Sequence, residues 1–281
     1  MTILNRLCVP APAKLNLFLH VTGRRADGYH LLESLFVAID LGDTITLTRR
    51  DDGTIRRTTE LAGVPPESDL AVRAAVALKK TTACSFGVDI ALTKRVPMGG
   101  GMGGGSSDAA SVLLALNRLW DTKVSRDDLM RIGLALGADV PFFLQGAPAI
   151  ARGIGEALTP VSSPPLWIAV IVPPTSVETA AIFAAPELTR NSPSAKIDVF
   201  SVGYGRNDLQ EVASARIPEI AVALQYLRKR STAARMTGSG SAVFAPFASE
   251  TDARAAVDGR PTAMRGFVAR TLAQHPLAAF V

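Results

Sequence analysis

The sequence has few cysteines and no long apolar run. Among 281 residues only Cys8 and Cys84 are cysteines, which excludes a disulfide framework or a zinc knuckle and suits a reducing cytoplasm. Apolar stretches such as residues 166–172 end after roughly seven residues, whereas a membrane span needs about 20. The first residues lack the apolar core of a signal peptide. We therefore expect a cytoplasmic protein with no membrane partner.

Charge of one sign is also not concentrated anywhere. Lysine and arginine number 30 against 25 acidic residues, a net charge of +5. This excess permits an anionic ligand, but the basic residues are scattered and not interleaved with aromatics, so the sequence does not favour an RNA-binding module or another nucleic-acid partner. A hydrophobic content of 48% supplies ample core and excludes a disordered chain. The length predicts about two domains.

The apolar patterns predict both strands and helices. Residues 13–21 alternate, with Leu15, Leu17 and Leu19 on one face and Lys14 and Asn16 on the other, which predicts a half-buried strand. Apolar residues at helical spacing predict the helices, and proline pairs bracket one buried strand. The expected helices span residues 68–80, 108–120 and 125–136, and further strands span residues 88–96, 166–172 and, as the last one, 242–247.

Glycine is the residue with an unusual distribution. Six of the 23 glycines fall within residues 99–105, between an expected strand and a helix that Ser106, Ser107 or Asp108 could cap. A helix N-terminus exposes unpaired N–H groups and the positive end of the helix dipole. Neighbouring glycines allow positive φ angles, so several N–H groups can converge on an anion. A hinge or tight turn needs only one or two glycines, so the cluster favours a phosphate-binding loop.

The run matches neither of two common phosphate motifs. Gly99, Gly101 and Gly104 satisfy the dinucleotide pattern formally, but about 90 residues precede them and Asp121, near the expected acidic position, lies in a polar turn. No Lys-Ser or Lys-Thr pair follows the glycines, as a P-loop would require. A dinucleotide oxidoreductase is therefore the weakest alternative.

Three segments resemble the superfamily of galactokinase, homoserine kinase, mevalonate kinase and phosphomevalonate kinase (GHMP kinases). They are PMGGGMGGGSSDAA at residues 97–110, PAKLNLFL at residues 12–19 and MTGSGSA at residues 236–242. The resemblance implies an α+β fold of two domains with the active site in the cleft between them. We place an ATP-binding domain, similar to a ribosomal-protein fold, at residues 1–160 and a substrate-binding domain at residues 161–281.

The resemblance also implies that the glycine run binds ATP, with Mg²⁺ carried by the nucleotide and few protein ligands. Asp69 stands where the family usually has an asparagine near the ATP ribose, so an acceptor replaces a donor and acceptor at this position. The implied ATP-binding residues are Pro97, Met98, Gly99, Gly100, Gly101, Met102, Gly103, Gly104, Gly105, Ser106 and Ser107.

Two charged residues are candidates for the chemistry. From the pattern alone, Asp139 is a turn or cap residue after Gly137, and Lys14 is a solvated strand lysine. The resemblance implies instead that Asp139 accepts the proton of a substrate hydroxyl and that Lys14 lies beside it, where its charge favours the developing negative charge. We predict that the two side chains lie within about 4–6 Å of each other.

Two further segments, GRRADGYH at residues 23–30 and LGADVPF at residues 136–142, resemble one group of kinases within the superfamily, and this resemblance implies a small-molecule substrate that carries a cytidine diphosphate. The resemblance implies that Tyr29 and Phe183 stack on the cytosine, that His30 hydrogen-bonds to it, and that Thr179 and Asn16 line the same site. From the pattern alone, Tyr29 and His30 would pack on the surface and Phe183 would pack in the core. The alternative is another kinase of the superfamily, such as a homoserine or mevalonate kinase. The aromatic residues argue against it, because the substrates of those kinases offer no base to stack. We expect a monomer or a weak homodimer.

Overall fold

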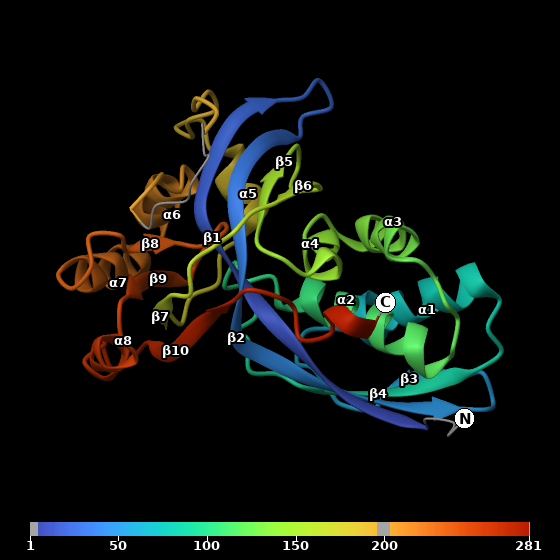
Figure 1. Cartoon of the computed structure of the whole chain (residues 1–281). Helices are drawn as coiled ribbons and strands as arrows, with labels where there is room; N and C mark the ends of the chain where they lie inside the picture. Colours follow the sequence, from blue (N-terminus) through green and yellow to red (C-terminus); the bar gives the residue numbers. More distant parts are fainter. Residues whose placement is uncertain (1–4, 196–202, 281) are drawn as a thin grey trace.

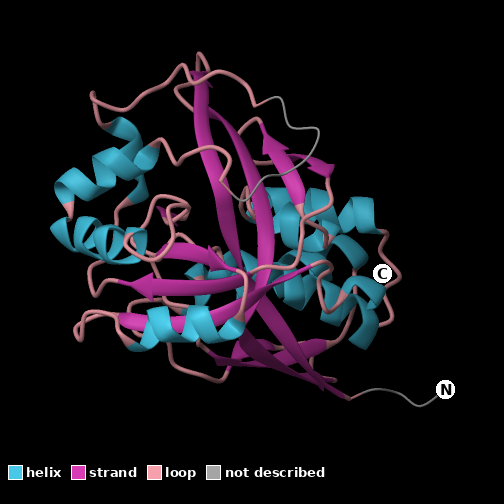
Figure 2. Cartoon of the chain, turned by 60° about the vertical axis from the view of Figure 1, so that its left-hand side comes forward, coloured by secondary structure: helices cyan, strands magenta, loops and turns pink. Residues whose placement is uncertain are grey.

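The computed structural model describes residues 5–195 and 203–280. A long antiparallel ribbon of β1 (Arg6–Arg24) and β2 (His30–Arg50) runs through the molecule, and a turn at residues 25–29 joins its two strands (Figure 1). Helices lie on both sides of this ribbon, and the strands lie between them (Figure 2). None of the helices in the described part of the chain has the length and apolarity that crossing a membrane requires.

The first half of the chain builds a helical layer against one side of the ribbon. Helix α2 (Gly104–Leu119) packs on β1 and β2, and buried apolar residues of α1 (Leu70–Thr82), α2 and β4 (Gly87–Thr93) form a shared core. Helix α3 (Arg126–Leu136) lies where the sequence predicts a helix at residues 125–136; Ser125 caps it by accepting from the N–H of Asp128, and Gly137 is its C-cap. The elements are β3 (Ile55–Arg57), η1 (Pro66–Ser68), α1 (Leu70–Thr82), β4 (Gly87–Thr93), α2 (Gly104–Leu119), α3 (Arg126–Leu136), α4 (Val140–Gln145), β5 (Ala149–Arg152) and β6 (Ala157–Pro160).

The second half continues the same sheet. In the described residues the strand order is β3-β4-β2-β10-β7-β9-β8, and β10 joins the halves by pairing with both β2 and β7. The strand predicted at residues 242–247 is present as β9 but is not the last, because α8 and β10 follow it. The elements are β7 (Trp167–Val172), α5 (Thr179–Ala184), α6 (Leu209–Arg216), α7 (Pro218–Arg228), β8 (Arg235–Met236), β9 (Val243–Phe247), α8 (Glu250–Asp258), β10 (Arg265–Leu272) and η2 (Ala278–Phe280).

Strand β1 is not the half-buried strand that its alternation predicts. Its register against β2 shifts between Asn16 and Phe18, so Leu17 and Phe18 pack in one core while Leu19 packs with the second half. The second half covers the face that the sequence pattern left open to solvent. Lys14 and Asn16 are consequently only 4% and 1% exposed, which places both side chains inside the molecule.

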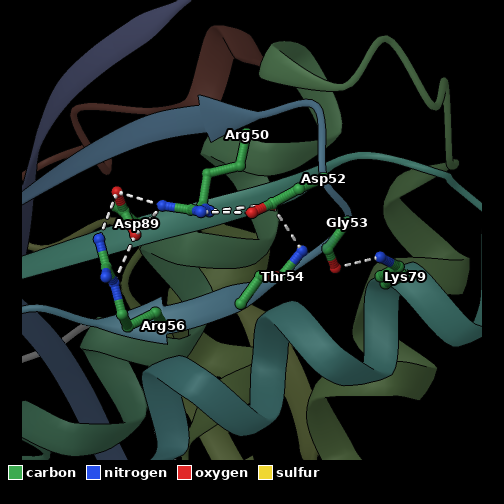
Figure 3. Close-up of polar contacts among 7 residues, drawn as sticks. All are labelled: Arg50, Asp52, Gly53, Thr54, Arg56, Lys79 and Asp89. Atoms are coloured by element: carbon green, nitrogen blue, oxygen red, sulfur yellow. Dashed lines mark hydrogen bonds and ion pairs between the residues drawn. The ribbon is translucent and has the colours of Figure 1, made fainter.

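A network of charged residues holds the turn between β2 and β3 (Figure 3). Arg50 pairs with Asp52 and, at 3.1 Å, with Asp89 of β4, to which Arg56 also donates at 3.0 Å. Exposed ion pairs of this kind contribute little individually. Gly87 allows the close approach, because a Cβ there would lie 2.1 Å from the carbonyl oxygen of Thr54. The ion pairs and this close backbone approach together connect the turn to β4, beside the pairing of β3 with β4.

Candidate active site

The glycine run forms a loop that leads directly into helix α2. Gly99, Gly101 and Gly103 have φ angles of 71°, 73° and 68°, a region that favours glycine. The helix begins at Gly104, with Gly103 at the N-cap and no side-chain cap. The prediction that Ser106, Ser107 or Asp108 caps this helix is therefore wrong, because all three lie within it. The preceding strand also ends earlier than predicted, at Thr93.

A second glycine turn, at residues 237–241, packs against this loop. A Cβ at Gly101 would lie 2.4 Å from the carbonyl oxygen of Thr237, and the Ala242 N–H donates to the carbonyl of Gly100 at 3.2 Å. Asn16 joins the turn to β1, because its Oδ1 accepts from the Gly238 N–H at 2.9 Å. Two segments about 140 residues apart in the sequence are thereby fixed against each other and against β1.

Asn16 is largely occupied by the protein itself. Its Oδ1 also accepts from Lys14 Nζ at 2.7 Å and from the Thr237 hydroxyl at 3.2 Å, while its Nδ2 donates to Ser34 Oγ at 2.9 Å. The side chain therefore positions its neighbours, and the substrate contact that the resemblance implies for Asn16 stays a prediction.

Lys94 lies beneath the glycine loop between two carboxylates. Its Nζ is 2.5 Å from Asp43 Oδ2 and 2.5 Å from Asp108 Oδ2 of helix α2. The other oxygen of Asp43 accepts from the backbone N–H groups of Arg95 and Val96. Burial raises the pKa of Asp108 to about 7 against the opposing charge of Lys94. This network fixes the entry to the loop relative to the start of α2.

Lys14 and Asp139 meet as predicted. Lys14 Nζ lies 3.4 Å from Asp139 Oδ2, with Asp139 30% exposed at the side chain. The backbone N–H of Lys14 donates to Met102 of the glycine loop at 2.9 Å, and its ammonium lies 4.6 Å from the centroid of the Phe36 ring. Asp139 occupies the N-cap position of α4 but makes no capping hydrogen bond, so its carboxylate is directed to Lys14 instead of to its own helix.

Three neighbouring cavities share lining residues. The loop cavity, of about 160 Å³, is lined by Lys94 and the loop itself. The central cavity, of about 250 Å³, shares Gly101 and Gly103 with it and contains Lys14 and Asp139. The aromatic cavity, of about 610 Å³, shares four residues with the central one. These shared residues are Leu32, Ile154, Thr179 and Phe183. The predicted catalytic pair thus lies between the other two cavities.

The aromatic cavity collects the residues expected to bind a base. His30 and Phe183 are in ring contact, with centroids 5.0 Å apart and planes 31° from parallel. Tyr29 is 62% exposed at the rim, and Thr179 Oγ1 lies 2.7 Å from Ser239 Oγ. Burial lowers the pKa of His30 below its usual value, and the charges of Arg190 and Arg24 lower it further. The imidazole is therefore neutral at neutral pH.

Some predicted residues lie outside the cavities. Ser106 and Ser107 line none of the three, and the hydroxyl of Ser107 is buried without a hydrogen-bond partner among the described residues. Asp69 caps α1 by accepting from the Ala71 N–H and pairs with the buried Arg57 at 2.7 Å. Arg57 therefore compensates the negative charge that replaces the asparagine typical of the family.

Sequence reasoning did not identify Lys94 or Arg190. Lys94 comes three residues before Pro97, and a basic residue just before a glycine loop is a signal that could have found it. Arg190 donates to His30 Nε2 at 3.0 Å across 160 residues of sequence, and no local pattern indicates that contact.

Comparisons with known proteins identify the family to which this chain is similar. A family model described as GHMP kinases N terminal domain matches residues 69–147, and one described as GHMP kinases C terminal matches residues 193–265. A protein of Thiobacillus denitrificans named 4-diphosphocytidyl-2-C-methyl-D-erythritol kinase is 57% identical over 272 residues, or 97% of this chain and 98% of that protein. One of the same name from Cupriavidus metallidurans is 54% identical, over 96% and 94% of the two chains.

Solved structures are also similar. A crystal structure of 4-(cytidine 5'-diphospho)-2C-methyl-D-erythritol kinase superposes with a TM-score of 0.83 at 34% identity, covering 94% of this chain and 99% of that one. A homoserine kinase from Cytophaga hutchinsonii superposes with a TM-score of 0.75 at 18% identity, over 98% and 97% of the two chains. The second match shows the fold alone. Together the matches confirm the predicted fold class.

Proposed function

We propose a function from the family of this chain, which belongs to the 4-diphosphocytidyl-2-C-methyl-D-erythritol kinases within the GHMP kinases. The chain transfers the γ-phosphoryl group of ATP to the 2-hydroxyl of 4-diphosphocytidyl-2-C-methyl-D-erythritol. The products are ADP and the 2-phosphate, a step of the non-mevalonate route to isoprenoid precursors. The observation that carries the proposal is the position of Lys14 and Asp139, 3.4 Å apart, in the cavity between the glycine loop and the aromatic residues.

The glycine loop is the proposed site for the ATP phosphates. The N-terminus of α2 carries a partial positive charge and unpaired N–H groups. Gly101 and Gly103 line both the loop cavity and the central cavity, so a nucleotide in the first would present its terminal phosphate to the second. Phosphoryl transfer depends mainly on such positioning and on charge stabilisation.

Asp139 and Lys14 are the proposed catalytic residues. The Asp139 carboxylate accepts the proton of the substrate hydroxyl. The hydroxyl oxygen of the substrate bonds to the γ-phosphorus, while the bond from this phosphorus to the bridging oxygen of ADP breaks. The Lys14 ammonium, held by Asn16 at 2.7 Å, stabilises negative charge at the reacting centre. A positioned base of this kind contributes about 10²–10⁴-fold in rate.

Magnesium would be held mostly by the nucleotide. In residues 5–195 and 203–280 no three acidic, histidine or cysteine side chains cluster to cage a metal ion, and Asp43 and Asp108 are engaged by Lys94. Asp139 is the carboxylate lining the central cavity that would face the ion, and Mg²⁺ commonly takes one or two carboxylates together with substrate phosphates. When bound, the ion would neutralise phosphate charge.

The aromatic cavity is the proposed site of the cytidine. Stacking of a base on an aromatic ring contributes about 1–3 kcal/mol, and Tyr29, His30 and Phe183 all line this cavity. A cytoplasmic location, a monomeric or weakly dimeric state and the domain boundary near Val161 remain predictions.

The test is ATP consumption with the cytidine substrate, with 2-C-methyl-D-erythritol 4-phosphate, which lacks the cytidylyl group, and with homoserine or mevalonate. We expect turnover only with the cytidine substrate, and a loss of at least tenfold in kcat/KM for Phe183→Ala. Equal turnover of the compound without the cytidylyl group would reject the base-binding assignment. Turnover of homoserine or mevalonate in its place would reject the proposed substrate.

A further inference from the structure

The contact between Arg190 and His30 is not explained by phosphoryl transfer itself. Arg190 Nε donates to His30 Nε2 at 3.0 Å. The same guanidinium donates to the carbonyls of Leu188, Phe183 and Ala185 at 3.0, 3.0 and 2.7 Å. Three carbonyls therefore fix the arginine in the turn after α5, and its Nε–H is directed at the imidazole.

This contact determines the protonation of His30. A guanidinium has only donors and stays protonated, so the Nε2 that it meets must be an unprotonated acceptor. A neutral imidazole then carries its proton on Nδ1. The charged groups near the ring are Arg190 and Arg24, and both oppose a second proton. The surroundings of His30 thus select the neutral tautomer with Nδ1–H.

The Nδ1–H group is available to a ligand. Among the described residues, none makes a hydrogen bond with His30 Nδ1. The atom is also absent from the buried polar atoms that lack a partner, so it is open to solvent. The ring lines the aromatic cavity and lies 5.0 Å from the Phe183 ring. The imidazole therefore presents a fixed donor beside an aromatic surface.

We propose that Arg190 is a positioning residue for base recognition, which holds His30 in the tautomer whose Nδ1–H donates to an acceptor on the edge of the substrate cytosine. This inference rests on the proposed function. Cytosine has two adjacent acceptors, N3 and O2, on its pairing edge, so a fixed donor complements it. An imidazole free to exchange its proton between nitrogens would offer that donor only part of the time.

The first measurement is the tautomer of His30, from long-range ¹H–¹⁵N NMR of the labelled full-length protein without substrate. The wild type should show Nδ1–H, and Arg190→Met should show a mixture with Nε2–H and a raised pKa of His30. The matched control is Arg216→Met, because Arg216 also donates to a carbonyl of α5, that of Ala181 at 2.8 Å, but not to His30. An Nε2–H tautomer in the wild type would overturn the proposal.

The second measurement is a double-mutant cycle of Arg190→Met and His30→Phe in steady-state kinetics. Arg190→Met should raise KM for the cytidine substrate about tenfold, with kcat and the KM for ATP within about twofold of the wild type. In the His30→Phe background, Arg190→Met should add less than about twofold.

The outcomes separate this inference from the proposed function. If the two substitutions multiply fully, Arg190 acts through the fold of the α5 turn and not through His30, and this inference fails while the kinase activity stands. If the wild type binds ATP but does not turn over the cytidine substrate, the proposed function fails and this inference fails with it.

Discussion

The Lys14 ammonium lies 3.4 Å from the Asp139 carboxylate, and the two residues reach this contact from different layers of the fold. Lys14 comes from β1, whose two faces are covered by the two halves of the molecule, and Asp139 comes from the link between α3 and α4. The lysine is almost fully buried, and the aspartate lines the central cavity. The Asp139 carboxylate is therefore held in place by the lysine before a ligand enters the cavity.

Gly101→Ala should weaken ATP binding and destabilise the protein. A Cβ at residue 101 would lie 2.4 Å from the Thr237 carbonyl oxygen, so the two glycine segments would have to separate. The control is Gly63→Ala, because Gly63 has a similar φ of 74° but nothing within 4 Å of the added Cβ. Both substitutions cost about 1 kcal/mol in backbone strain.

Thermal unfolding and ATP titration would measure the difference. We expect Gly101→Ala to lower the free energy of unfolding by about 2 kcal/mol more than Gly63→Ala and to raise the KM for ATP at least tenfold. Equal effects of the two substitutions would contradict the prediction and show that the contact between the glycine segments contributes to neither stability nor ATP binding.

Local patterns predicted the elements better than they predicted the site. Glycine clustering and helical periodicity depend on neighbouring residues, so the loop, α1, α2 and α3 could be read from the sequence. The burial of β1 could not, because the second half of the chain supplies the covering face. The contact of Lys14 with Asp139 followed only from family resemblance, and the pairing of Lys94 with Asp43 and Asp108 depends on side chains that tertiary packing brings together.

Asp108→Asn should become relatively more stable as pH rises. Burial raises the pKa of Asp108 to about 7, whereas the unfolded chain releases this proton near the ordinary value. Between these two pKa values, rising pH deprotonates the unfolded state but not the folded state, so the free energy of unfolding of the wild type falls. The asparagine variant has no such titration and does not lose this free energy. The difference in free energy of unfolding should grow by on the order of 2 kcal/mol from pH 5 to pH 8. Urea unfolding at several pH values measures it, and parallel curves for the two proteins would contradict it.

His275→Asn should reduce the loss of stability in acid. Burial, assisted by the charge of Arg126, lowers the pKa of His275 to about 4 from its usual 6.5. As pH falls through this window, the unfolded state gains a proton that the folded state does not, so the wild type loses stability. In the wild type the Leu277 N–H donates to His275 Nδ1 at 3.1 Å. Asparagine does not titrate, and its side-chain oxygen can accept this hydrogen bond.

The wild type should lose about 2–3 kcal/mol more than His275→Asn between pH 7 and pH 4. Chemical denaturation across this range provides the test, with the two proteins compared at each pH so that titration of other groups cancels. If the two proteins lose the same free energy of unfolding, His275 is not the group responsible.

Asp139→Asn measures the central claim most directly. The amide keeps the shape of the side chain but does not accept a proton from the substrate hydroxyl, so kcat with the cytidine substrate should fall about 10²–10⁴-fold while KM for ATP stays within about threefold. The matched control is Asp121→Asn, at an exposed aspartate with a φ of 52° outside the three cavities, which should leave kcat unchanged. A kcat for Asp139→Asn equal to that of the wild type would contradict the account.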